Sequence, residues 1–357
     1  MTTTTTIAPS VSPFRANDAV KGFLWIYGLS IVSCYLVNLW VISNPIGPWQ
    51  GEEIAKSFWL DNVSWQIFSA WWACFFVVCG FWPFNGIKNT TTRGILVVAA
   101  SWILGWWSAK LIFLIGPGAD GIFPLVGTTW FLLAFFCFAG GGFLAAKLPP
   151  RRQFFLYLIL FTGLTYVITH SAVKWVPAWW FPFLLVGLGT GTLSYLTRGL
   201  QQPGRAVVMM ATLFAVAALC FQISAAAGFW EFDKSPISSF WSMGHFTDDS
   251  FWLLCFFTAT SINYAMPIIT HNWPFSMIRM PWGGLLACAF YLVLDVVVAS
   301  LLFKLVGPVF GSMEELLTYA YMGVNWSLVI PLVFGIGLQE PYLWVGQKTP
   351  GEWDDVA

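Results

Sequence analysis

Long apolar stretches separated by short polar segments run along the chain from residue 23 to residue 342. A helix that crosses the hydrocarbon core of a bilayer needs about 20 mostly apolar residues. The pattern therefore predicts an all-α, polytopic membrane protein with about ten transmembrane helices. The predicted spans are Phe23–Ser43, Trp65–Phe84, Ile95–Gly116, Pro124–Leu148, Phe154–Ser171, Trp180–Thr197, Val207–Trp230, Phe251–Thr270, Gly284–Val306 and Val324–Tyr342.

The segments outside these spans are too short to build a separate soluble domain. Residues 1–20 lack the basic start, apolar core and small-residue cleavage site of a signal peptide, so we expect a disordered tail there. Residues 21–343 are then one transmembrane helical domain, and residues 344–357 form a short cytoplasmic tail.

Composition supports the same class of protein. Hydrophobic residues make up 58% of the chain and charged residues only 9%, with a mean hydropathy of +0.73. A soluble domain carries roughly 25% charged residues, so we expect the lipid bilayer to be the main environment of this chain. The 16 basic residues are balanced by 16 acidic ones, which argues against a nucleic-acid partner.

Lysine and arginine predict the orientation, because they concentrate in cytoplasmic loops. With the N-terminus inside, the outer segments hold only Lys56, Lys174 and Lys234, together with acidic residues such as Asp61. The cytoplasmic segments hold Arg15, Lys21, Lys88, Arg93, Lys147, Arg151, Arg152, Arg198, Arg205, Arg279 and Lys348. This bias places both chain ends in the cytoplasm, and we expect a bacterial inner (plasma) membrane.

Two similar segments indicate an internal repeat. The second predicted span ends at Trp82-Pro83-Phe84, and the eighth is followed by Trp273-Pro274-Phe275. A basic residue stands four positions after each phenylalanine, at Lys88 and Arg279. This pattern favours parallel repeats over residues 23–148 and 207–342, an arrangement found in transporters. Aromatic belts and basic inner loops produce similar patterns without duplication, so that alternative stays open.

Ionisable groups inside the spans are the strongest functional candidates, because a charge near the bilayer centre costs at least about 2.5 kcal/mol. Asp295 lies near the middle of the ninth span, and Tyr291 shares its helix face at a spacing of four. Lys110 lies in the third span and is expected to bend towards Asp295 or up to the outer headgroups. Asp295 then serves proton or ion coupling or solute contact, or it forms a structural ion pair or hydrogen bond.

Other polar residues in the spans extend this predicted solute or ion pathway. Gln222 lies in the seventh span, and Thr260 and Asn263 lie in the eighth. Glu340 precedes Pro341 near the inner end of the tenth span, where proline frees a backbone carbonyl. Glu340 fits either a proton site or an ordinary interfacial residue.

The sequence gives little sign of a metal, a cofactor or catalysis. His170 and His245, with Asp248 and Asp249, form a weak candidate for an outer metal site, and solvated loop groups are the competing interpretation. A nucleotide-binding loop and the common hydrolase motifs are missing. We therefore expect no cofactor and favour a protein that is not an enzyme.

The 23 tryptophans and 34 phenylalanines fit interfacial anchoring and bundle packing, and also a pathway for an aromatic solute. We interpret the chain as a secondary transporter or permease for a small, apolar or aromatic solute, with proton or ion coupling as an option. The alternatives are a membrane-embedded enzyme or enzyme subunit that acts on a lipid-soluble substrate, and a non-catalytic membrane subunit or assembly factor. Partner membrane subunits or a homo-oligomer are compatible with each of these functions.

Overall fold

A computed structural model gives the arrangement of the larger helices. It describes residues 16–47, 53–115, 128–129, 132–140, 142–145, 147–171, 200–212, 215, 258, 262, 274–279, 282–310 and 313–334. These residues are helical or lie in turns and connections, and none of them forms a strand. The predicted all-α class is therefore confirmed for the described part of the chain.

The described helices include six long ones and several short ones. The long helices are α1 (Ala16–Ser43), α2 (Glu53–Val78), α3 (Thr90–Ile115), α5 (Pro150–Ser171), α11 (Trp282–Leu301) and α13 (Met313–Phe334). The short helices are η1 (Phe84–Gly86), the π-helices η2 (Ala134–Ala139) and η4 (Leu302–Val306), η3 (Phe275–Met277) and α12 (Gly307–Phe310).

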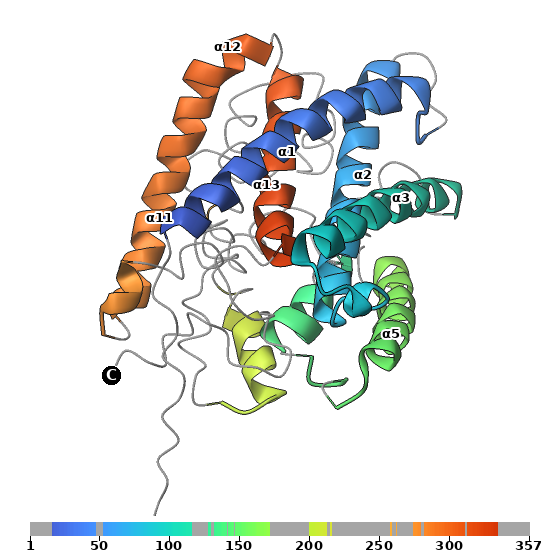
Figure 1. The fold of residues 1–357 in the computed structure, drawn as a ribbon, viewed down its shortest axis with the longest axis vertical. Coiled ribbons are helices and arrows are strands. Elements are labelled where there is room, and N and C mark those ends of the chain that lie inside the picture. Colours follow the sequence, from blue (N-terminus) through green and yellow to red (C-terminus); the bar gives the residue numbers. More distant parts are fainter. Residues whose placement is uncertain are drawn as a thin grey trace, which may run out of the picture.

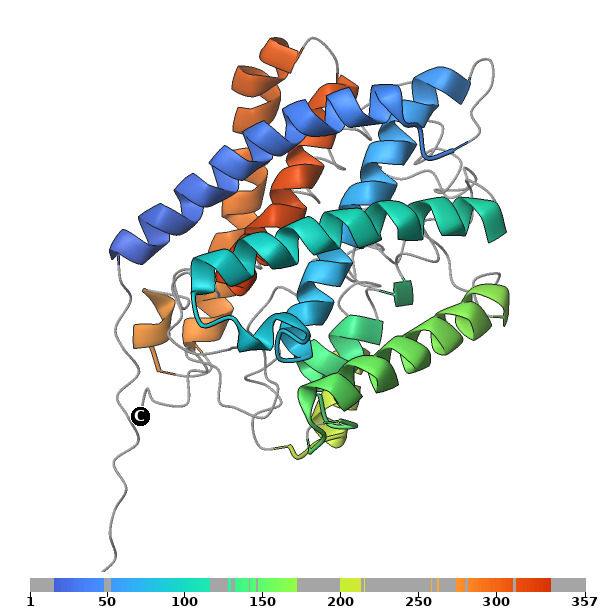
Figure 2. The same ribbon diagram turned by 45° about the vertical axis from the view of Figure 1, so that its right-hand side comes forward.

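Helices α1 and α3 lie on the same side of the pair formed by α2 and α13 (Figures 1 and 2). Helix α2 packs on α3 and α13, and α13 also packs on α1. Helix α5 reaches the lower end of α2, where the ring of Phe154 lies 5.0 Å from that of Phe75 and 4.9 Å from that of Trp82. The first helices of the chain and its last described helix therefore share one core.

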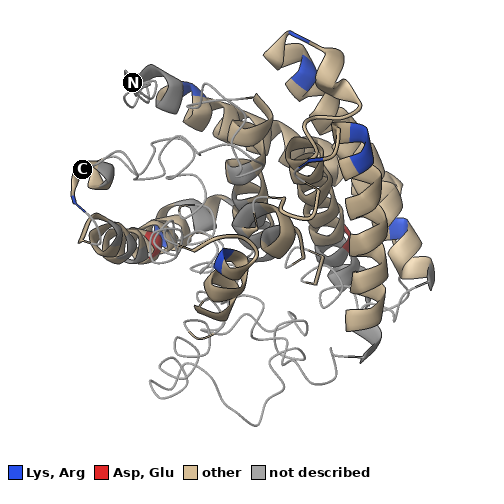
Figure 3. Cartoon of the chain, turned by 90° about the horizontal axis from the view of Figure 1, so that it is seen from below, with Lys and Arg blue, Asp and Glu red and all other residues tan. Residues whose placement is uncertain are grey.

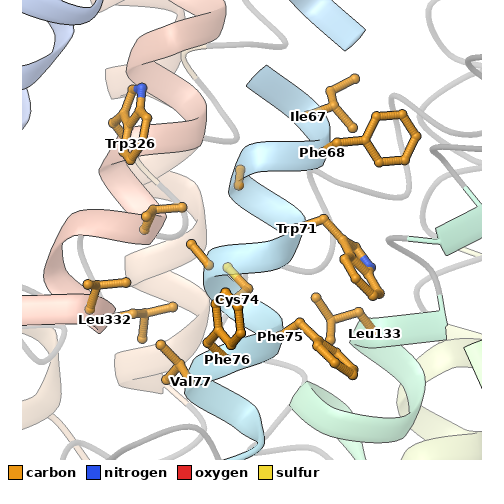
Figure 4. Packing of buried hydrophobic residues seen from close by; sticks show 14 of the residues in the cluster. Ile67, Phe68, Trp71, Cys74, Phe75, Phe76, Val77, Leu133, Trp326 and Leu332 are labelled. Carbon is orange, nitrogen blue, oxygen red and sulfur yellow. The ribbon is translucent and has the colours of Figure 1, made fainter. Parts of the chain in front are cut away.

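Helix α2 is the centre of this core. From Asp61 to Cys79 every residue is buried except Trp72, which is partly buried. Figure 4 shows Trp71 and Phe75 pointing towards Leu133, and Cys74 and Val77 on the side of α13. A helix that is covered by protein on all sides does not need an apolar surface for lipid, so it can carry polar residues.

Three described segments are long and apolar enough to cross a membrane: Val20–Ser43, Thr90–Leu114 and Leu285–Leu305. Each leaves most of its surface uncovered by the rest of the protein, with only 25–28% of the residues in its most apolar stretch buried. Apolar side chains such as Ile42 (75% exposed) and Leu114 (79% exposed) require lipid rather than water around them. The molecule is therefore a helical membrane protein.

Several predicted boundaries were wrong. The second span was expected at Trp65–Phe84, but α2 begins at Glu53 and ends at Val78. The tenth span was expected at Val324–Tyr342, but α13 begins at Met313. The hydropathy pattern left the polar first halves of both helices outside the predicted spans. Several of their polar residues are nevertheless buried against protein. Helix α1 begins at Ala16, within the stretch predicted as a disordered tail.

The fourth span also departs from the prediction. A continuous helix was expected over Pro124–Leu148, but the described residues turn into the π-helix η2 and then into turns at residues 142–145. Gly142 adopts φ = +66°, a conformation that glycine accepts without strain. The chain therefore leaves the helix at this point and reaches α5 through a folded connection.

The two Trp-Pro-Phe segments have the same described backbone conformation from the proline onward. Pro83 (φ −87°, ψ 4°) and Pro274 (φ −85°, ψ −3°) each precede a three-residue 3-10 helix that begins at the phenylalanine. Each 3-10 helix ends when the next isoleucine, Ile87 or Ile278, becomes extended and donates its backbone N–H to the phenylalanine carbonyl at 3.0 Å. The sequence similarity thus corresponds to a shared local structure.

Candidate functional site

Helix α11 has one buried face and one exposed face. The buried face follows a spacing of four residues and contains Ala287, Tyr291, Asp295 and Ala299, each at most 3% exposed. The opposite face is apolar and exposed, as at Val293 (64%). This spacing brings Tyr291 and Asp295 to one side of the helix, as predicted, and directs Asp295 into protein rather than lipid.

Asp295 lies where the helix that contains Thr258 meets α11. The Thr258 hydroxyl donates a hydrogen bond to the backbone carbonyl of Asp295 at 3.2 Å, and Thr258 is itself only 5% exposed. Ile262 packs against Ala287 and Tyr291 further along the same contact. The candidate site therefore includes a hydroxyl group that holds the backbone of Asp295 against the neighbouring helix.

Helices α2 and α3 make a comparable contact in the first half of the chain. The Trp65 indole donates to the Trp102 carbonyl at 2.8 Å, and these residues are 37 positions apart, as are Thr258 and Asp295. One turn further on, Ser69 lies so close to Gly105 that a Cβ on Gly105 would stand 2.6 Å from the Ser69 backbone nitrogen. In each half a side-chain donor thus bonds to a backbone carbonyl 37 positions further on, across the two helices that flank the Trp-Pro-Phe turn.

Lys110 bends back along α3, as the tilt of helical side chains predicts, but its contact is not Asp295. Its Nζ lies 4.8 Å from the centre of the Trp106 ring, one turn nearer the N-terminus. A cation over the face of an indole is attracted by the ring's negative charge density. Lys110 and Asp295 form no ion pair, so the described residues do not bring these two predicted site residues together.

The remaining predicted site residues have no described side chain. Seven lie outside the described residues altogether: Gln222, Thr260, Asn263, Glu340, His245, Asp248 and Asp249. The backbone of His170 belongs to α5, but its side chain is outside the description. Among the residues that are described, no group of three or more His, Cys, Asp or Glu side chains is placed to hold a metal ion.

A second polar region was missed by the sequence analysis. The middle of α2 carries the fully or almost fully buried residues Asp61, Asn62, Ser64, Gln66 and Ser69. Asp61 was assigned to an outer loop, but it lies inside α2 with no exposed surface. Its carboxylate accepts the backbone N–H groups of Ile46 at 3.1 Å and of Gly47 at 3.2 Å. These bonds fix the connection that follows α1.

Three tryptophans from α2, α3 and α13 lie together beside this polar part of α2. The ring centres of Trp65 and Trp102 are 6.3 Å apart, and those of Trp102 and Trp326 are 5.6 Å apart in an edge-to-face arrangement. We call the three tryptophans Trp65, Trp102 and Trp326 the tryptophan junction.

Charged side chains are sparse on the described helices, and the tryptophan junction contains none (Figure 3). The exposed apolar helices and the buried polar groups together define a class of molecule. It is a polytopic helical membrane protein with a polar interior. Comparison with protein-family models, curated proteins and solved structures finds no match to the chain.

Proposed function

We propose that this protein is a secondary transporter or permease for a small, apolar or aromatic solute. The observation that carries the proposal is Asp295, a carboxyl group only 3% exposed on the inward face of a helix whose other face suits lipid. Such a residue is costly in a membrane and is found mainly where it serves an ion, a proton or a solute.

Proton exchange at Asp295 gives a simple coupling step. The neutral carboxylic acid is compatible with an apolar surrounding, whereas the carboxylate needs a cation, a hydrogen-bond donor or access to water. Tyr291 lies on the same buried face one turn away and carries a phenolic hydroxyl. Gain and loss of a proton therefore change the stability of alternative packings around α11, which is the requirement for coupled transport.

The finer topology belongs to the same proposal. We infer ten spans, with both chain ends in the cytoplasm of a bacterium and the protein in its inner membrane. The hydropathy pattern supports the count, three segments have the length and apolar composition of a span, and the loop-by-loop distribution of basic residues supports the orientation.

We also infer that residues 23–148 and 207–342 are parallel repeats. The matching turns at Pro83 and Pro274 support this relationship. Transporters built from repeats bind their solute at the repeat interface and alternate access by moving one unit against the other. A duplicated helix pair on either side of a shared core suits that mechanism.

The direct test measures transport by the full-length protein in proteoliposomes. We would record currents on a solid-supported membrane after concentration jumps of L-tryptophan, L-phenylalanine and p-hydroxybenzoate at several pH values. For the transported solute we expect a current that varies with pH in the wild type. Asp295→Asn keeps the shape of the side chain but cannot exchange a proton, so the pH dependence should disappear.

Ser300→Ala is the matched control on the same helix. The Ser300 hydroxyl bonds only to the carbonyl of Val296 in the preceding turn, so its removal should leave current and pH dependence unchanged. A pH dependence that persists in Asp295→Asn would rule out the coupling role of Asp295.

A further inference from the structure

The turn that follows α2 holds an arginine of α3 over an aromatic ring. The guanidinium carbon Cζ of Arg93 lies 4.1 Å from the centre of the Phe81 ring, an attractive contact between a cation and a ring face. Phe81 adopts φ = +60°, a conformation that bulky residues rarely adopt. Arg93 Nε has no hydrogen-bond partner in the described part of the chain. The ring, rather than a carboxylate, therefore positions this guanidinium group.

The first turn of α5 adds two more arginines beside the same turn. Arg151 and Arg152 are exposed and precede Phe154 and Phe155 by three residues each. The ring of Trp82 lies 4.9 Å from the ring of Phe154 and 5.3 Å from the ring of Phe155. Residues three apart share a face of a helix, so both arginines lie on the side of α5 that meets Trp82. The residue before Trp82 carries the ring under the third arginine, so all three flank one turn.

These three arginines, Arg93, Arg151 and Arg152, are called the arginine cluster, and the helices that carry them supply no carboxylate. Aspartate and glutamate are absent from residues 62–119 and 121–230 of the sequence. These ranges contain all of α3, all of α5 and the turn after α2. Cations gathered without an opposite charge repel one another, so an anion bound from outside the protein would stabilise the cluster.

Exposed apolar side chains continue the helix faces that begin at the arginine cluster. On α3, Leu96 follows Arg93 by three residues and is 40% exposed. On α5, Leu156 (40% exposed) and Ile159 (73% exposed) follow Arg152 by four and seven residues. Arg93 also lies at the start of the apolar segment Thr90–Leu114, which is long enough to span a membrane. A cationic end that leads into an apolar face matches a molecule with an anionic head and acyl chains.

We propose that the arginine cluster binds an anionic phospholipid whose headgroup carries two phosphates, as in diphosphatidylglycerol. The phosphate oxygens accept hydrogen bonds from the guanidinium groups, which suit phosphate because their donors form a planar fork. A headgroup with two phosphates reaches the arginine of α3 and the arginine pair of α5 together. The acyl chains lie along Leu96, Leu156 and Ile159. The site requires only that the protein lies in a membrane, so it is independent of the proposed transport function.

The test titrates the purified full-length protein in detergent with defined lipids and counts the bound molecules by native mass spectrometry. We expect one tetraoleoyl diphosphatidylglycerol per chain. Its Kd should be at least about fivefold lower than that of dioleoyl phosphatidylglycerol, which has one phosphate charge fewer. Dioleoyl phosphatidylcholine has the same acyl chains without a net charge and should bind most weakly. Equal affinity for the three lipids would overturn the proposal.

The double variant Arg151→Gln/Arg152→Gln should raise the Kd for diphosphatidylglycerol about tenfold or more, and Arg93→Gln should raise it about fivefold. Lys21→Gln is the matched control, because Lys21 is an exposed basic residue on α1 rather than on α3 or α5. The control should keep the wild-type Kd. An unchanged Kd in the double variant, or an equal rise in the control, would contradict a site at the arginine cluster.

Thermal unfolding shows whether the double variant keeps its fold. Without lipid its Tm should equal that of the wild type, because both replaced side chains are exposed. Diphosphatidylglycerol should raise the Tm of the wild type and leave that of the double variant unchanged. A fall in the lipid-free Tm would assign the two arginines to the fold and overturn their role in binding.

Two other occupants give different results in the same titration. Inorganic phosphate in excess, at constant ionic strength, should not displace the lipid, since it lacks acyl chains. Displacement would identify a site for a soluble anion and overturn the proposal. The acidic residues near the chain end, Glu352, Asp354 and Asp355, lie outside the described residues. A variant that ends at Pro350 should keep the wild-type Kd, whereas clearly tighter lipid binding would show that the chain end is the native occupant.

Discussion

Gly105 is the residue at which the packing of α2 on α3 leaves no space for a side chain. A Cβ there would stand 2.6 Å from the backbone nitrogen of Ser69 and 2.8 Å from its Cα. Small residues at a helix contact allow the backbones to approach closely, which is a main source of helix association in membranes. Gly105 thus determines how deeply α3 sits on the central helix.

Gly105→Ala should therefore destabilise the protein by about 1–3 kcal/mol, since the added methyl group forces the two backbones apart. Thermal unfolding of the purified protein in detergent, followed as Tm, checks this expectation. Gly28→Ala on α1 is the matched control, because a Cβ there meets nothing within 4 Å. The control should hold or raise the Tm, by the equivalent of about 0.4–1 kcal/mol. A Gly105→Ala variant as stable as the control would disprove the close contact.

At the level of the element, α11 shows a division between a lipid side and a protein side. Leu285, Val293 and Val297 are 47–64% exposed, whereas Ala287 and Ala299 are at most 2% exposed. Because the exposed side chains are apolar and the helix is long enough to span, the exposed face is expected to contact acyl chains.

Nitroxide labels placed by cysteine substitution along α11 should report this division. In reconstituted vesicles, labels at Leu285, Val293 and Val297 should collide readily with dissolved oxygen, which concentrates in the bilayer core. Labels at Ala287 and Ala299 should be shielded, and electron paramagnetic resonance measures the difference. An accessibility profile without the helical period, or one with Ala299 as accessible as Val293, would contradict the assignment of Asp295 to the protein interior.

The two polar regions differ in how far the sequence could predict them. Asp295 was predicted to lie in the middle of a span because an apolar stretch surrounds it, and Tyr291 to share its helix face because the two are four residues apart. Asp61 was assigned to a loop because a hydropathy pattern excludes charged residues from a helix that lipid surrounds. Helix α2 is instead surrounded by protein, which accepts a buried carboxylate. The tryptophan junction has no local pattern at all, since it joins residues 65, 102 and 326 through tertiary packing.

At the scale of the whole molecule, the central position of α2 joins helices from both proposed repeats in one core. Helix α13, from the second proposed repeat, packs on α2, from the first, and the tryptophan junction lies at that contact. A binding site shared by two units is accessible from alternate sides when one unit moves against the other.

The proposed orientation can be tested with two cysteine positions in intact cells that carry a variant without native cysteines. Asn44 follows α1 and should face outwards, whereas Lys88 follows η1 and should face the cytoplasm, because basic residues collect on that side. Asn44→Cys should react with a membrane-impermeant maleimide added to intact cells. Lys88→Cys, which is at an exposed turn, should react only after permeabilisation. Labelling of both positions from outside would place α1 and α2 on a different path through the membrane, and the coupling proposal for Asp295 would then lose its topological basis.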